Sequence, residues 1–425
     1  MLVYNNMVHD ARVRKEAKTL AGAGYDVTVL AVLDPGPVPK EEHVEGFRIL
    51  RIGRSILGLS RKEIAARISP PRSVGQAKDA SPLVARPRRS SMRSRVATLL
   101  STVGRLPFYP IRRVVVFLRF VGAALGTRAD VYHAHDLNTL LMAWTASRLR
   151  RTPLVYDTHE VATDRAEMKF RWWAELLERA LIGRADRVIC TNDTRAEYTR
   201  KRYDIPPPAV LRNLPAYVDP EPSTLMQDRL RLPHDTKIVL YQGGIQPERG
   251  LEQLIEAAPE IEGGVVVLLG SGRLKPRLVA RAAQSRLEGK VCFHEAVPVG
   301  ELPGWTACAY VGLQLLQNTC FNHYSSLSNK LLEYMMAGVP VIASDLPEMR
   351  RVIEDTGAGL VIDASKPREI ARAVNELLAA PQRREQMAQR ARERRREYAW
   401  EQEESLLIEM YDGLFPSSQP GATKS

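Results

Sequence analysis

The chain has 425 residues, 44% of them hydrophobic, and a formal net charge of +12. This length exceeds what one core ordinarily supports and predicts two globular domains of roughly 150–200 residues, which excludes a fibrous or disordered protein. The longest apolar run, at 114–126, is too short for a membrane span and carries Arg119, so we expect no transmembrane helix. Polar residues follow the first five residues of the chain directly, so we expect no signal peptide. Four cysteines without metal-ligand spacing fit a reducing, cytoplasmic compartment.

The first part of the chain alternates strands and helices. An apolar strand is predicted at 1–5, a helix from Asp10 to Ala23, and further strands at 25–32 and 47–52. Because Met1 falls inside the first strand, either this strand is short or the native chain begins upstream.

Residues 54–129 interrupt the alternation and carry most of the net charge. No acidic residue lies between Asp79 and Asp130, whereas ten arginines do. Prolines mark 69–90 as a loop or disordered part, and aliphatic residues separate the later arginines. We therefore predict that 86–120 docks on anionic lipid headgroups. Nucleic acid is the alternative, which we disfavour because the apolar residues are not aromatic residues spaced for base stacking, and a solvated surface is the third interpretation.

Alternation resumes at residue 129, with strands predicted at 129–136, 153–160, 185–192 and within 206–215. Some six strands alternating with helices imply a parallel, doubly wound sheet, whose ligands bind beyond the carboxyl ends of the strands. The polar side chains expected at those ends are His133, His135, Asp157, His159 and Glu160.

A second αβ series follows a polar linker. We predict domains at 1–215, with the insert at 54–129, and at 237–395, joined by a linker at 216–236. A last helix at 396–414 would cross back to the first domain, and 415–425 would be a disordered tail. Strands of the second series are predicted within 237–244, 265–272, 290–297, 309–316, 339–344 and 359–362.

The stretch 325–344 reads SSLSNKLLEYMMAGVPVIAS. Apolar residues at helical spacing predict a short helix, with Ser328 or Asn329 as its N-cap and Gly338 ending it. Lys330 and Glu333 share one side of this helix, whose N-terminus suits an anionic phosphate. The alternative is an ordinary amphipathic helix with a surface ion pair.

Five stretches in order along the chain resemble the GT-B glycosyltransferases, and more narrowly the retaining family 4. They are DARVRKEAKTLAGAGYDVTVLAV, DVYHAHD, YDTHE, YQGGIQPERGLEQLIEA and SNKLLEYMMAGVPVIASD. The resemblance implies an α/β protein of the GT-B class, with two Rossmann-like doubly wound parallel-sheet domains facing a cleft.

The resemblance also assigns roles. His135 matches the histidine near the donor hexose, with His133 more simply explained as a packed core residue. Arg249 matches the residue that neutralises the pyrophosphate, and Glu333 the carboxylate that binds the nucleotide ribose. Lys330 and the main chain of Ser326, Leu327, Ser328 and Asn329 would line the sugar and phosphate pocket. The donor-binding set also includes Ser325 and the glycines at which the backbone can come close, Gly243, Gly244 and Gly270. Asp157, His159 and Glu160 would face the acceptor, although Asp157 and Glu160 fit strand-end caps equally well.

Two positions depart from the family pattern. The first carboxylate of the E-x7-E pattern is Ser325, and a basic residue usual in many members is Gly244. Sugar identity is therefore open, and a weak or inactive enzyme is the alternative to a variant active site.

We accordingly expect a metal-independent hexosyltransferase that needs no cofactor, since no D-x-D occurs in the chain. Its partners would be a nucleotide-diphosphate sugar, a lipid or saccharide acceptor and the inner face of the membrane, without nucleic acid. The resemblance implies retention of configuration by front-face attack, in which the departing phosphate helps deprotonate the acceptor, so no protein nucleophile is required. A nucleotide-sugar epimerase and a non-catalytic binding protein remain the competing hypotheses.

Overall fold

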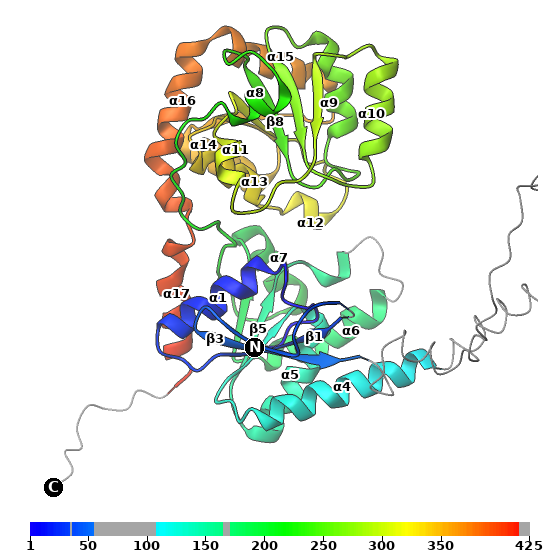
Figure 1. Ribbon diagram of the computed structural model, residues 1–425. Coiled ribbons are helices and arrows are strands. Elements are labelled where there is room, and N and C mark those ends of the chain that lie inside the picture. Colours follow the sequence, from blue (N-terminus) through cyan, green and yellow to red (C-terminus); the bar gives the residue numbers. More distant parts are fainter. Residues whose placement is uncertain (35, 55–107, 165–170, 416–425) are drawn as a thin grey trace, which may run out of the picture. The chain divides into compact units, whose positions relative to one another are not determined.

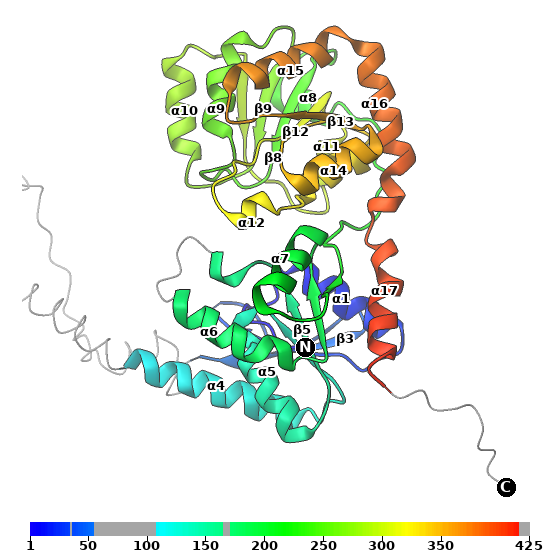
Figure 2. The same cartoon turned by 180° about the vertical axis from the view of Figure 1, so that it is seen from behind.

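A computed structural model describes residues 1–34, 36–54, 108–164 and 171–415. The arginine-rich insert up to residue 107 and the tail at 416–425 lie outside the described residues. The chain divides into two compact units, Met1–Leu154 and Val155–Ser425 (Figures 1 and 2).

The first unit begins with a βαβ arrangement. Helix α1 (Ala11–Gly22) starts at Asp10, whose carboxylate accepts a hydrogen bond from the Val13 N–H, as expected of an N-cap. Strands β1 (Thr28–Leu33), β2 (Glu41–Val44) and β3 (Phe47–Gly53) form a sheet of order β1-β3-β2. The sequence did not reveal β2, because its polar residues EEHV pair antiparallel with β3 and lie mostly toward solvent.

The predicted strand at 1–5 is short. Leu2 pairs with Leu30 of β1 on one side and with Ala134 of β4 (Tyr132–His135) on the other. The Leu2 N–H donates to the His133 carbonyl over 2.7 Å, and the Leu30 N–H donates to the Met1 carbonyl over 2.8 Å. This segment therefore lies between β1 and β4. Helices α4 (Phe108–Gly126) and α5 (Leu137–Arg150) complete the unit.

The second unit begins within the strands that follow β4. The sheet order is β4-β5-β6-β7, with β5 (Leu154–Thr158), β6 (Arg187–Cys190) and β7 (Ala209–Val210) paired in parallel. The connections are η1 (Ala162–Asp164), α6 (Arg171–Leu181), η2 (Ile182–Arg184) and α7 (Asp193–Tyr203).

A six-stranded parallel sheet forms the rest of the unit, with order β10-β9-β8-β11-β12-β13. All six predicted strands of the second series are confirmed. They are β8 (Ile238–Gln242), β9 (Val265–Leu269), β10 (Val291–His294), β11 (Val311–Gln314), β12 (Val341–Ser344) and β13 (Gly359–Ile362).

Helices cover both faces of this sheet (Figure 1). Val239 and Tyr241 join a core with α9 (Leu251–Ala257), α10 (Lys275–Gln284) and α15 (Pro367–Ala379). Ile238 and Leu240 point to the opposite face, as alternate residues of a strand do. That face is covered by α8 (Leu225–Leu230), α11 (Leu302–Thr306), α13 (Asn329–Met336) and α14 (Pro347–Thr356).

The chain ends with α16 (Pro381–Arg394), η4 (Arg395–Tyr398) and α17 (Glu401–Asp412). Glu403 of α17 accepts hydrogen bonds from the Arg212 N–H and Nε at 2.8 and 2.7 Å, so the last helix packs on the chain that follows β7. Within the described residues, no helix combines the length and apolar content needed to cross a bilayer.

Candidate active site

Helix α13 presents Lys330 and Glu333 on its partly exposed side, as the sequence predicted. Gly338 adopts φ +66° after the last turn, which confirms it as the residue that ends the helix. The N-cap is Ser328, although its side chain makes no capping hydrogen bond. The opposite side of the helix is buried in the core through Leu331, Leu332, Tyr334, Met335 and Met336.

Tyr334 fixes α13 to the carboxyl end of β8. Its hydroxyl donates to the Leu240 carbonyl over 2.9 Å and accepts from the Gln242 N–H over 3.0 Å. A Cβ on Gly312 would lie 2.4 Å from the Tyr334 ring, so the neighbouring strand needs glycine at this point. The position of Glu333 next to the end of β8 follows from this packing.

Glycines at the ends of β8 and β9 let the backbone approach the α13 lysine. Gly243 has φ +112°, and a Cβ there would lie 2.3 Å from Lys330 Cε. Gly270 has φ +150°, and a Cβ there would lie 2.0 Å from the Gly243 carbonyl oxygen. Gly244 differs, because a Cβ there would have only Gln246 Cγ nearby, at 3.6 Å. A side chain would therefore fit at Gly244.

The charge of Arg249 acts on Lys330 near this turn. Burial, and to a smaller extent the charge of Arg249, lower the pKa of Lys330 to about 8, while the charge of Glu333 opposes the shift. The Lys330 ammonium lies 5.8 Å from the centre of the Tyr241 ring. Within the described part of the chain, neither the Arg249 nor the Lys330 side chain makes a hydrogen bond or an ion pair. Neighbouring cations without a paired anion favour binding of an anionic group.

His323 belongs to the same electrostatic neighbourhood. Burial lowers the pKa of its imidazole, and Arg249 lowers it further. Its Nδ1 lies 2.9 Å from the Thr319 hydroxyl and 3.2 Å from the Gln317 carbonyl oxygen. The sequence analysis did not single out this histidine, which lies in the one-turn helix α12 (Phe321–Tyr324), because a helix of this length has no apolar periodicity.

Ser325, which stands where the family carries a carboxylate, is fully buried. Its hydroxyl donates to the Phe321 carbonyl over 2.8 Å and lies 3.1 Å from the donating Nε of Arg195. Asn192 donates to the Ser325 carbonyl over 2.7 Å. The serine side chain is thus engaged in local packing.

The main chain after Ser325 leads into the helix. The Ser326 N–H donates to the His323 carbonyl over 3.1 Å, so it is already used. The N–H groups of Leu327, Ser328 and Asn329 donate to no acceptor among the residues that the structure describes. Such groups at a helix N-terminus can bind an anionic oxygen.

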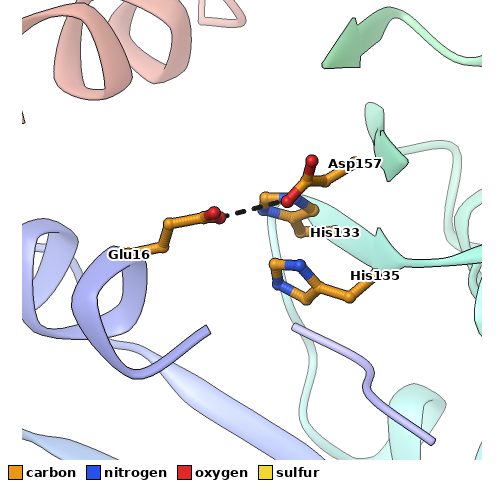
Figure 3. A group of neighbouring side chains, drawn as sticks. All are labelled: Glu16, His133, His135 and Asp157. Carbon is orange, nitrogen blue, oxygen red and sulfur yellow. Dashed lines mark ion pairs between the residues drawn. The ribbon is translucent and has the colours of Figure 1, made fainter. Parts of the chain in front are cut away.

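His135 and His133 lie in β4, at the carboxyl end predicted for them. Both are buried, and their rings stack with centroids 4.1 Å apart. His133 Nε2 lies 3.9 Å from a carboxylate oxygen of Glu16, the contact dashed in Figure 3. With Asp157, also drawn there, these residues have the donor types of a metal site. Because the Arg12 guanidinium already lies 2.9 Å from Glu16, we assign no metal to them.

The remaining predicted residues lie at the end of β5. Asp157 is buried, and its Oδ2 lies 3.0 Å from Nε2 of the partly exposed His159. Glu160 is exposed. An Asp–His pair of this kind orients the imidazole.

Two comparisons identify the family. The model of the glycosyl transferases group 1 matches residues 223–394, and that of the glycosyl transferase 4-like domain matches 10–213. A D-inositol 3-phosphate glycosyltransferase of Thermobispora bispora is 26% identical, with 67% of this chain and 70% of that protein aligned. Another from Xylanimonas cellulosilytica is also 26% identical, over 66% and 71%.

Solved structures of similar fold support the assignment. Sucrose-phosphate synthase from Thermosynechococcus elongatus superposes with a TM-score of 0.68 at 20% identity, covering 96% of this chain and 93% of that one. HepE of Anabaena in complex with UDP-glucose gives 0.66 at 14% identity, covering 97% and 99%. These likenesses confirm the GT-B fold, and with the two family models matching most of the sequence, the chain belongs to the group 1 glycosyltransferases.

Proposed function

We propose that this glycosyltransferase moves a hexose-type sugar from a nucleoside diphosphate sugar to a lipid or saccharide acceptor, with retention of configuration. The observation that carries the proposal is the pair of cations, Arg249 and Lys330, beside the glycine turn after β8. When the glycosidic bond breaks, negative charge accumulates on the departing diphosphate. Positive groups held in place before the reaction stabilise that charge most effectively.

Glu333 would bind the hydroxyl groups of the nucleotide ribose. It lies one helical turn from Lys330, and one of its carboxylate oxygens accepts a hydrogen bond from Gln242 over 2.8 Å. The N–H groups of Leu327, Ser328 and Asn329 would receive phosphate oxygens at the start of α13. HepE was solved with UDP-glucose, which makes UDP-sugars the first donors to test.

The acceptor would be deprotonated by the departing phosphate, so the proposed reaction uses no protein nucleophile and no metal ion. The family resemblance implies that His135 would contact the donor hexose. Asp157 orients His159 for contact with the acceptor, and Glu160 lies next to it in sequence. The names of the curated relatives add D-inositol 3-phosphate to the lipid and saccharide acceptors that merit testing.

We also propose that the enzyme acts at the cytoplasmic face of a membrane. The described end of the basic segment is α4, where Val114 and Leu118 are 56% and 60% exposed one turn apart, next to the exposed Arg112 and Arg113. Apolar and basic side chains on one surface helix suit anionic lipid headgroups. Trp172 and Trp173 of α6 are also exposed, and tryptophan favours the bilayer interface.

Vesicle sedimentation tests the membrane proposal. We expect binding to vesicles containing phosphatidylglycerol, and loss of binding when Val114 and Leu118 are both changed to Asp. Changing the exposed Val299, at 85% exposure, to Asp serves as the control. If the double variant binds the vesicles as well as the control variant does, α4 is excluded as an anchor.

Donor turnover tests the proposal as a whole. The protein is incubated with UDP-, GDP- and ADP-sugars, with and without EDTA, and released nucleotide is measured. We expect release from one nucleotide class, insensitive to EDTA. Thermal stabilisation by the bare nucleotide without release would instead indicate an inactive nucleotide-sugar-binding protein, the alternative that Ser325 favours. Absence of both effects would refute the donor site.

A further inference from the structure

We infer that Gln242 is a positioning residue that holds Glu333 ready for the ribose. The inference rests on the proposed function, in which Glu333 binds the ribose hydroxyls. Gln242 is the last residue of β8 and is 1% exposed. Its Nε2 donates to Glu333 Oε2 over 2.8 Å, and its Oε1 accepts from the Thr306 hydroxyl over 2.8 Å.

The orientation of the Gln242 amide follows from these partners. An ionised carboxylate only accepts hydrogen bonds, so the amide nitrogen must face Glu333. The amide oxygen then faces Thr306, whose hydroxyl proton it shares with the Leu302 carbonyl, also at 2.8 Å. Both ends of the amide are therefore used, and the side chain has little freedom to turn.

The backbone of Gln242 is equally constrained. Its N–H donates to the Tyr334 hydroxyl, and Tyr334 follows Glu333 directly in α13. The strand that carries the donor and the helix that carries the acceptor are thus joined at two points. Glu333 is therefore oriented before any ligand arrives.

A neutral donor suits this task better than a cation would. It restrains one carboxylate oxygen and leaves the negative charge of Glu333 in place. Within the described residues, Glu333 Oε1 accepts no hydrogen bond, and the side chain is partly exposed. That oxygen can receive a ligand hydroxyl. Restraining a carboxylate before binding reduces the conformational entropy lost when the ligand binds.

The test compares ligands with and without ribose. Affinities are measured by calorimetry for the best binder among UDP, GDP and ADP, for its 2′-deoxy analogue and for inorganic pyrophosphate. The proteins are wild type, Gln242→Met, Glu333→Ala and the double variant, with Gln227→Met as a matched control, because Gln227 is another buried glutamine, in α8.

We expect Gln242→Met to weaken nucleotide binding roughly tenfold, the scale of one lost hydrogen bond, without changing pyrophosphate binding. The loss should be smaller for the 2′-deoxy analogue, and it should disappear when Glu333 is already Ala. Gln227→Met should bind all three ligands as wild type does.

A second variant guards against a folding defect. Gln242→Glu keeps the shape and replaces the donor by an acceptor, so its nucleotide affinity should recover as the pH falls and the two carboxylates share a proton. A wild type that binds no nucleoside diphosphate would overturn the proposed function and the inference with it. The inference alone would be overturned if the wild type binds the nucleotide and Gln242→Met binds it with the same affinity. It would also be overturned if Gln242→Met lowers the nucleotide affinity as much in the Glu333→Ala background as in the wild type.

Discussion

Replacing Lys330 by Met should strengthen the fold and weaken the site. Methionine keeps the length of the lysine stem that lies against Gly243 but removes the charge. In the unliganded protein that charge is costly, because the side chain is buried enough to lower its pKa from 10.5 to about 8 and lies near Arg249. With a diphosphate bound, the same charge becomes favourable.

The magnitude follows from the pKa shift. A difference of 2.5 pKa units corresponds to about 3 kcal/mol at ~1.36 kcal/mol per unit. Because Lys330 is partly exposed, solvent screening reduces this upper bound, and we expect a gain in unfolding free energy of about 1–2 kcal/mol at pH 7. The loss of a charged contact to the diphosphate should weaken UDP binding roughly ten- to hundredfold.

The sign of the pH dependence can be checked independently. Between pH 8 and 10.5 the unfolded lysine holds its proton more fully than the folded one, so the wild type gains stability as the pH rises through this window. The gain in unfolding free energy that Lys330→Met brings over the wild type should therefore be complete below pH 8 and absent above pH 10.5.

Urea unfolding at pH 7 and pH 10.5 measures the stability gain and its disappearance at high pH, and calorimetry with UDP measures the loss of affinity. Lys366→Met is the control, because Lys366 is exposed and ion-paired with Asp363, which raises its pKa. A Lys330→Met protein less stable than wild type at pH 7, or stabilised equally at both pH values, would refute the argument that this lysine is held charged at a cost.

Three further outcomes are expected from the same cluster. Gly243→Ala should destabilise the protein by about 1–3 kcal/mol in urea unfolding and weaken UDP binding, because alanine disfavours φ +112° and its Cβ would displace Lys330. Gly244→Ala, the control, should be nearly neutral. Glu333→Ala should weaken UDP binding by about 1.5–3 kcal/mol in calorimetry, and unchanged affinity would count against its ribose role. Wild-type affinity for UDP should fall about tenfold between pH 7 and pH 9 as Lys330 loses its proton, and a flat profile would exclude this lysine from the diphosphate site.

The architecture could be predicted from the sequence wherever the signal was local. Runs of β-branched residues between helical patterns located all six strands of the second sheet, since a strand buried on both faces is apolar along its whole length. The exposed strand β2 has no such run, and its place depends on pairing with β3. The arginine-rich residues 86–107 lie outside the described residues, so the interpretation of that part of the insert stays a prediction.

The candidate site, too, could be predicted only where its residues are close together in the sequence. Lys330 and Glu333 are three residues apart on one helix, so their shared side follows from helix geometry. Gln242 is 91 residues away from Glu333 in sequence, and no local pattern relates them. Sequence therefore locates the charged residues of the site, whereas the neutral residues that orient them emerge only from tertiary packing.

Ser325 decides how the departure from the family pattern should be interpreted. A position that had merely lost its carboxylate would leave a cavity or unmatched polar groups, whereas the Ser325 hydroxyl contacts both the Phe321 carbonyl and the Arg195 guanidinium. Ser325→Ala should therefore cost about 1–2 kcal/mol of unfolding free energy, because the Nε of the buried Arg195 loses its acceptor, whereas the Phe321 carbonyl keeps the Ser325 N–H. UDP affinity should stay at the wild-type value, since the serine faces packing partners. A Ser325→Ala protein as stable as wild type would mean that the serine is incidental, and the inactive-protein alternative would gain weight.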